Sequence, residues 1–141
     1  MKFNEKTVLF TLAAIQFTHI MDFMIVMPLG PQLMRIFNIT PQQFGFIVAS
    51  YTIAAGIFGF AAAFFIDRFD RRKALLVCYS GFAIGTIACA LSPGYEMLLL
   101  ARMATGAFGG IIGTLVLSII GDLIPFERRA SAMGMVMMAF S

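Results

Sequence analysis

The fold of this chain is decided by residues 103–121, which read MATGAFGGIIGTLVLSIIG and carry no charged side chain. A helix rises about 1.5 Å per residue, so this stretch with a few flanking residues can cross the roughly 30 Å hydrocarbon core of a bilayer. The stretch is also rich in glycine, and small residues let two helices approach closely inside lipid. Residues 103–121 therefore predict a membrane-spanning helix that packs against other helices.

The composition of the whole chain points the same way. Of its 141 residues, 60% are hydrophobic and 12% are charged, and the mean hydropathy is +0.92. Soluble domains are about half apolar and a quarter charged, so the composition excludes a soluble globular domain. It also excludes soluble disorder, because 16 Phe and 11 Met give the chain ample apolar surface to bury.

The same composition argues against several classes of function. The net charge of +3 comes from only ten Lys and Arg, and most of these lie in short clusters between apolar runs, so we expect no nucleic-acid partner. The chain has one histidine, no Cys/His spacing typical of a metal site, and no phosphate-binding glycine loop after a strand. We therefore expect no enzymatic activity, no metal and no cofactor.

The charged residues separate the chain into further apolar stretches. Four are long enough to span a bilayer as helices, whereas a fifth rises only about 18 Å. We predict an all-α membrane protein, a transmembrane helical bundle, and interpret the chain as the front part of a longer one; a short interfacial helix is the alternative for the fifth stretch. The complete spans are predicted at about residues 7–28, 42–66, 74–92 and 97–120, and the incomplete one at 130–141.

The basic residues give this bundle an orientation. Cytoplasmic loops of membrane proteins carry an excess of Lys and Arg. Arg35 alone falls on one side of the predicted bundle. The N-terminus is therefore expected in the cytoplasm, together with eight basic residues: Lys2, Lys6, Arg68, Arg71, Arg72, Lys73, Arg128 and Arg129.

Two charges, Asp22 and Arg102, fall within predicted spans, and each costs up to about 3 kcal/mol in mid-membrane. Asp22 lies about 22 Å from the inner end of its span, and Arg102 lies about 8 Å below the outer end of a 30 Å core, so both occupy the same depth. We hypothesise that they meet between the first and fourth spans and that Asp22 carries a proton. The alternative is that Arg102 extends to the outer surface.

A polar stripe surrounds Asp22 on the first span. His19 lies one turn before it, and Thr11 and Thr18 lie on the same face. Such a stripe is typical of a cavity wall, so we expect His19 to share the proton-coupling and substrate cavity with Asp22 and Arg102. The alternative is that these side chains bond back to their own helix or to a neighbour.

Small residues within the spans predict where the helices touch. At 100° per residue, Gly106, Gly109 and Gly113 share an arc of about 60° with Arg102, so this arc is expected to face a helix contact. The full set of expected packing glycines is Gly59, Gly81, Gly85, Gly106, Gly109 and Gly113.

Two motifs in these stretches are similar to signatures of a known family. Residues 67–73 read DRFDRRK, which resembles the signature loop of the major facilitator superfamily: Gly, three residues, Asp-Arg, one residue, Gly-Arg-Arg or Lys. Ala63 and Asp70 stand where that loop has glycine. Residues 102–106, RMATG, resemble the second signature on span four, with Thr105 in place of Gln.

Over all 141 residues the chain resembles the N-terminal half of a twelve-span drug–proton antiporter, and this resemblance carries several expectations. Residues 1–141 would form part of a six-helix half, and its partners would be the lipid bilayer, a small-molecule substrate and the C-terminal part of the same transporter. The protein would be a multi-pass protein of the cell inner (cytoplasmic) membrane. The expected function is proton-coupled efflux of drug-like or sugar-like molecules by alternating access, driven by the proton gradient.

The resemblance also assigns roles to residues. It implies that Asp22 and Arg102 take part in proton coupling. In the family, an acid and an arginine of the signature loop form a charge relay with an acid at the cytoplasmic end of span four. Here the expected conformational latch consists of this loop and that acid, namely Asp67, Arg68, Arg71, Arg72 and Asp122.

Two other functions remain compatible with the residues. One is a complete small four-span multidrug exporter acting as an oligomer, although the uneven distribution of basic residues argues against the dual orientation some of these use. The other is a non-transporting membrane scaffold that docks partners through its small-residue faces. Antiport and symport are both consistent with the sequence.

Overall fold

The chain folds as a bundle of α-helices, which confirms the predicted all-α class. The computed structural model describes residues 4–138, so the last part of the predicted incomplete span, residues 139–141, lies outside the described residues. Four of the helices are long and apolar enough to cross a membrane. The elements are α1 (Glu5–Phe37), α2 (Pro41–Phe65), the short 3-10 helix η1 (Ile66–Arg68), α3 (Arg71–Ala90), α4 (Tyr95–Leu123) and α5 (Phe126–Met137).

The turn between α1 and α2 follows from local sequence signals. Asn38 adopts a left-handed conformation with φ 52°, and its backbone N–H donates to the Met34 carbonyl, which closes α1. The Thr40 hydroxyl accepts from the Gln43 backbone N–H, while the Gln43 side chain accepts from the Thr40 N–H. This capping box starts α2, with Pro41 at its first position.

Helix α1 continues well beyond the predicted end of its span near Pro28. It runs to Phe37 with Pro28 and Pro31 inside it, and its 33 residues rise about 50 Å. Proline removes a backbone donor, but helices that span membranes tolerate it because neighbouring groups satisfy the freed carbonyls. The helix is therefore longer than the membrane span predicted at about residues 7–28.

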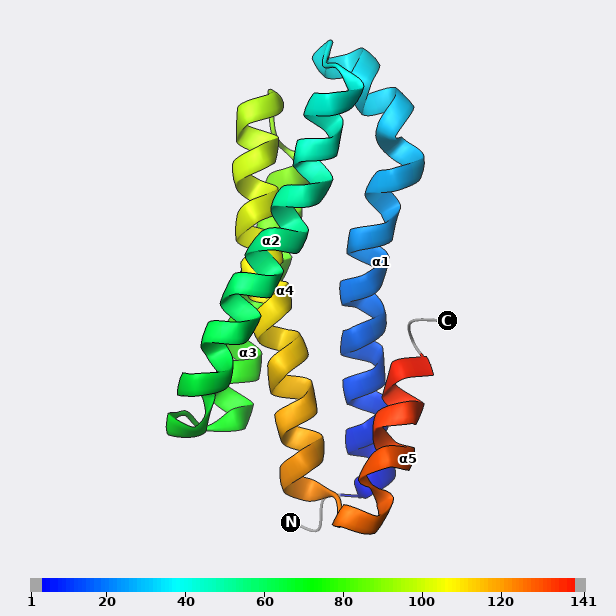
Figure 1. The fold of residues 1–141 in the computed structure, drawn as a ribbon, viewed down its shortest axis with the longest axis vertical. Coiled ribbons are helices and arrows are strands. Elements are labelled where there is room, and N and C mark those ends of the chain that lie inside the picture. Colours follow the sequence, from blue (N-terminus) through cyan, green and yellow to red (C-terminus); the bar gives the residue numbers. More distant parts are fainter. Residues whose placement is uncertain (1–3, 139–141) are drawn as a thin grey trace.

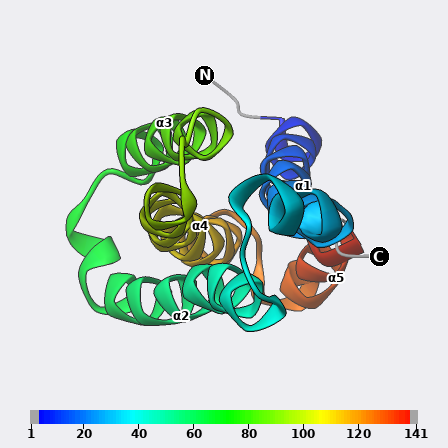
Figure 2. The same cartoon turned by 90° about the horizontal axis from the view of Figure 1, so that it is seen from above.

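Helix α4 occupies the centre of the bundle, with α2, α3 and α1 around it (Figure 2). The contact between α2 and α4 is the most extensive of the bundle. The two helices meet at glycine: a Cβ added to Gly59 would lie 3.0 Å from the Gly110 carbonyl oxygen, and a Cβ on Gly110 would collide with the backbone of Ala55. At the same place the Thr114 hydroxyl donates to the Gly59 carbonyl at 2.9 Å.

Four other glycines named from the sequence also lie at close contacts. A Cβ on Gly81 would meet the Phe108 ring, and one on Gly85 would meet the Thr105 hydroxyl. On α4, a Cβ on Gly106 would collide with the Tyr51 backbone, and one on Gly109 would meet His19 and the Tyr51 hydroxyl. These glycines bring α3, α2 and α1 against α4.

The packing prediction for Gly113 is wrong. A Cβ added there would find nothing within 4 Å among the described residues. Gly113 lies on the expected arc of α4, between the directions of α1 and α2. These two helices meet at the turn 38–40 and diverge toward the other end of the bundle (Figure 1).

The bundle has two chemically different ends. We call the end with the turns 38–40 and 91–94 the hairpin end, and the end with Lys6, η1 and the start of α5 the basic end. Near the basic end, α5 lies beside α1 (Figure 1), and Ala132 and Val136 of α5 are buried in the apolar core. An ion pair of 2.9 Å between Arg128 and Glu5 joins the same two helices.

The α2–α4 contact predicts opposite responses to one substitution at two glycines. Gly110→Ala forces the α2 and α4 backbones apart and is expected to lower the free energy of unfolding by about 1–3 kcal/mol. Gly113→Ala is the matched control, because its Cβ enters open space and alanine favours helix by up to about 1 kcal/mol. Thermal unfolding in detergent, followed by circular dichroism, measures both. Equal stability of the two variants would contradict the packing.

Candidate functional site

The most deeply buried charges of the described chain form an ion pair. Arg102 Nη1 on α4 donates to Asp22 Oδ2 on α1 at 2.9 Å, and the two side chains are only 2% and 9% exposed. The structure thus brings together the two residues that the depth argument placed at one level. An arginine that is 2% exposed does not extend to the surface. The alternative, in which Arg102 reaches the outer surface, is therefore wrong.

Two further side chains complete the surroundings of the pair. The Thr86 hydroxyl on α3 donates to Asp22 Oδ1 at 3.1 Å. The Tyr51 ring on α2 lies under the Arg102 guanidinium, with 4.3 Å from the guanidinium carbon to the ring centroid, a cation–π contact. All four long helices therefore contribute to one polar centre.

The sequence reasoning assigned no role in the pair to Thr86 or Tyr51. A usable signal existed for Thr86, which lies four residues before the end of α3 at Ala90. That spacing places Thr86 about 6 Å below the hairpin end of its helix, close to the depth of Arg102. For Tyr51 no such signal exists, because depth alone does not reveal which ring faces a guanidinium.

Buried polar atoms extend from the pair toward the basic end. Within the described chain, Gln16 Oε1, both ring nitrogens of His19, the Tyr51 hydroxyl, and Nε and Nη2 of Arg102 are buried without a hydrogen-bond partner. Gln16, His19 and Asp22 follow each other at intervals of three residues along one face of α1. An unpartnered buried polar group costs about 1–3 kcal/mol, so these polar atoms are costly to bury between the described helices.

The predicted stripe therefore has different members from those expected. His19 packs between Tyr51 and Phe82, with ring centroids 6.1 and 5.7 Å away, and makes no hydrogen bond to Asp22. Thr11 and Thr18 are exposed and donate to the carbonyls of their own helix. This agrees with the alternative that these side chains bond back to their own helix. Gln16, which the sequence reasoning did not select, is buried in their place.

A cavity of about 460 Å³ leads from the hairpin end to the ion pair. Its inner wall contains Asp22, Thr86 and Arg102, and its far end reaches Phe37 and Pro93 beside the two turns. Most of the remaining lining is aliphatic. The polar centre is thus accessible along an apolar passage. Among the described residues no cluster of three His, Cys, Asp or Glu is able to hold a metal ion.

A second charge network lies at the basic end. Arg71 Nη2 donates to Asp67 Oδ1 at 2.6 Å, and Arg71 Nε donates to Asp122 Oδ2 at 2.9 Å. Arg71, the first residue of α3, therefore connects η1 with the end of α4. The other two loop arginines take no part in it: the Arg68 guanidinium lies over the Phe65 ring, 5.9 Å from its centroid, and the exposed Arg72 lies about 100° further round α3. The expected latch is thus smaller than predicted.

The backbone of Asp70 shows how the loop forms without its second glycine. Its backbone is extended, with φ −60° and ψ 117°, so the left-handed conformation that favours glycine is not needed. The Asp70 carboxylate accepts from the backbone N–H groups of Arg72 and Lys73 at 3.0 and 3.4 Å. Asp70 is the N-cap of α3.

The fold is shared with a solved transporter structure. The crystal structure of a bacterial homolog to the human lysosomal transporter Spinster, in an inward-facing and occupied conformation, matches 99% of this chain with a TM-score of 0.91. The chain covers 30% of that structure at 24% sequence identity. The likeness concerns the arrangement of the helices.

Sequence comparisons agree with the structural one. The uncharacterized MFS-type transporter YcnB of Bacillus subtilis is 32% identical over 99% of this chain, and the multidrug resistance protein Stp of Mycobacterium tuberculosis is 31% identical over 81% of it. The chain spans only 29% and 21% of the lengths of these two relatives. The model of the Major Facilitator Superfamily matches residues 12–141. With nearly its whole length matched by that model, the chain belongs to the Major Facilitator Superfamily.

Proposed function

We propose that this chain supplies the first helices of a secondary active transporter that couples proton movement to the efflux of small molecules by alternating access. The observation that carries the proposal is the buried ion pair between Asp22 and Arg102. Ionisable residues inside a membrane are costly, and they mark ion and substrate pathways. Relatives named as a multidrug resistance protein and as an efflux pump support efflux of drug-like molecules.

Protonation of Asp22 is the proposed coupling step. A proton on Asp22 removes the negative charge that faces Arg102, and an arginine left buried without its counter-charge is strongly destabilised. The Tyr51 ring still faces the guanidinium, but a cation–π contact compensates only part of the lost interaction. Protonation therefore favours an arrangement of α1 and α4 in which Arg102 reaches water or another acid, and this difference shifts the population of the two states.

The polar stripe on α1 is the proposed route for the proton. His19 lies one turn from Asp22 toward the basic end, and Gln16 lies one turn further. The apolar cavity serves the other side of the pair, since it reaches Asp22 from the hairpin end. Asp22 thus has a candidate path on each side, as alternating access requires. The energy source is the proton gradient.

The network of Asp67, Arg71 and Asp122 is the proposed latch of the outward-open state. Both of its acids are largely exposed, and exposed ion pairs contribute about 0–1 kcal/mol each. Interactions this weak are readily broken, which suits a contact that must open in every transport cycle.

We further propose that the basic end faces the cytoplasm, with the N-terminus, and that the protein resides in the inner membrane of the cell. The excess of Lys and Arg at that end supports the orientation. The proposed partners are the lipid bilayer, a small drug-like or sugar-like substrate, and the C-terminal part of the transporter, which the relatives' greater length implies.

Asp22→Asn tests the coupling step. The amide oxygen still accepts from Arg102, and the amide nitrogen can donate to the Thr86 hydroxyl while that hydroxyl donates to the Phe82 carbonyl. The variant is therefore expected to fold, but it carries no titratable proton and should lose pH-gradient-driven efflux of ethidium and Hoechst 33342. The assay uses the product of the native gene in membrane vesicles, and Glu96→Gln, which removes an exposed acid of α4, is the matched control. Full gradient-driven efflux by Asp22→Asn would contradict the proposal.

Arg71→Gln tests the latch. It removes both ion pairs of the network and should change the free energy of unfolding by less than about 2 kcal/mol, while the efflux rate falls severalfold. Arg72→Gln removes a neighbouring arginine outside the network and should transport like the wild type. If the two variants transport equally well, the network is not a latch.

A further inference from the structure

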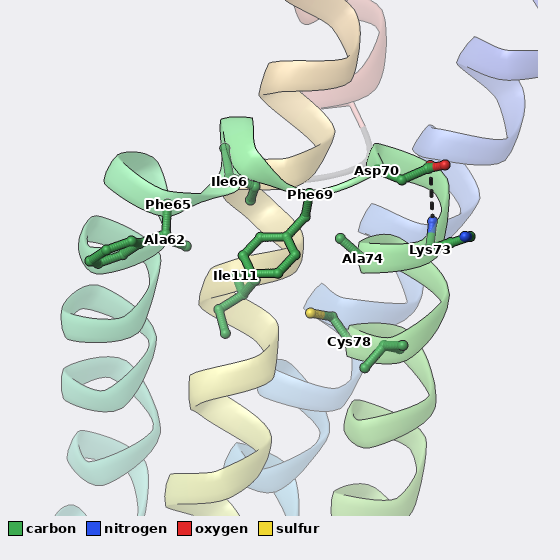
Figure 3. Close-up of a pocket in the computed structure, with 10 residues that line it drawn as sticks. Ala62, Phe65, Ile66, Phe69, Asp70, Lys73, Ala74, Cys78 and Ile111 are labelled. Atoms are coloured by element: carbon green, nitrogen blue, oxygen red, sulfur yellow. Dashed lines mark hydrogen bonds between the residues drawn. The ribbon is translucent and has the colours of Figure 1, made fainter.

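An apolar groove runs along the outside of the bundle at the basic end. It has a volume of about 500 Å³ and lies between α2, η1 and α3, with Ile111 of α4 at its floor. Figure 3 shows Phe65 on the α2 side, Ala74 and Cys78 along the α3 wall, and the Phe69 ring between these two sides. Phe69 is 64% exposed, although it sits on a loop that could have carried a polar residue.

The groove extends from the end of the bundle into the depth of the membrane. Its α3 wall runs from Lys73 to Cys78, a rise of about 7.5 Å. Helices α2 and α3 are both long and apolar enough to cross a bilayer. The charged end of the groove therefore lies at the level of lipid headgroups, and its apolar part lies at the level of acyl chains.

The charged side chains near the groove differ in whether they have a partner. The acids have partners: the Asp70 carboxylate caps α3, and Asp67 is held by Arg71. Lys73 lines the groove and forms no ion pair within the part of the chain that the structure describes. The guanidinium of Arg68 lies over the Phe65 ring on the α2 side. Two cations thus flank the mouth of an apolar groove.

We propose that this groove binds an anionic phospholipid, with one acyl chain along the apolar wall and the phosphate between Lys73 and Arg68. Basic pockets between membrane helices recognise anionic headgroups in this way. A zwitterionic lipid offers the same chain and phosphate, but its own cation opposes Lys73 and Arg68, so the site discriminates by net headgroup charge. The proposal does not depend on transport, because it concerns a surface remote from Asp22.

Lipid retention by the full chain tests the proposal. The chain, in detergent, is supplied with equal amounts of phosphatidylglycerol and phosphatidylcholine that carry identical acyl chains, and native mass spectrometry counts the lipids retained. A basic residue near a lipid surface contributes about fivefold to the affinity for an anionic lipid. Phosphatidylglycerol should be retained preferentially, and R68Q/K73Q should bring its retention close to that of phosphatidylcholine. R35Q removes a cation at the hairpin end and should retain phosphatidylglycerol like the wild type.

A steric variant separates a lipid in the groove from attraction to a basic surface. Ala74→Leu fills the groove and leaves every charge in place, so it should reduce phosphatidylglycerol retention severalfold. Ala63→Leu adds the same bulk at an exposed α2 position outside the groove lining and should have no effect. Equal retention of the two lipids by the wild-type chain overturns the proposal. A loss in R68Q/K73Q without a loss in Ala74→Leu also overturns it, since the lipid would then bind by surface charge alone.

Discussion

A charge inside a membrane must find a partner, and the ion pair between Asp22 and Arg102 is the constraint on which this bundle depends. At 2% exposure Arg102 is largely removed from water, so α1 and α4 must stay close enough for the 2.9 Å contact to persist. Thr86 adds α3 to the same centre, and the Tyr51 ring adds α2. The ion pair and these two contacts therefore connect all four long helices at one polar centre.

The glycines of α4 make this polar centre possible. Gly106 admits the Tyr51 backbone, and Gly109 leaves room for His19 and the Tyr51 hydroxyl. A side chain at either position would push α1 or α2 outward and lengthen the contacts to Arg102. Close packing and buried charge are thus two aspects of one arrangement: the helices need small residues to approach each other in lipid, and the charges need that approach to be paired.

Much of the fold was predictable from the sequence because it depends on one dimension, the depth along each helix. Counting residues from the span ends placed Asp22 and Arg102 at one level, and the structure joins them. The rotation of each side chain about its helix was less predictable. Gly113 lies on the expected arc of α4, but a Cβ there would touch none of the described residues, and Arg72 differs from Arg71 by a single step round α3. Tyr51 and Gln16 were missed because their burial depends on neighbours that are distant in sequence.

The account rests on the claim that Asp22 and Arg102 stabilise each other across α1 and α4. A double-mutant cycle with Asp22→Leu and Arg102→Met tests this claim through the free energy of unfolding in detergent. Each single variant leaves one buried charge unpaired and should lose about 3–5 kcal/mol, whereas the double variant, with neither charge, should lose far less than the sum. Losses that add to within about 0.5 kcal/mol would show that the two residues do not interact and would contradict the account.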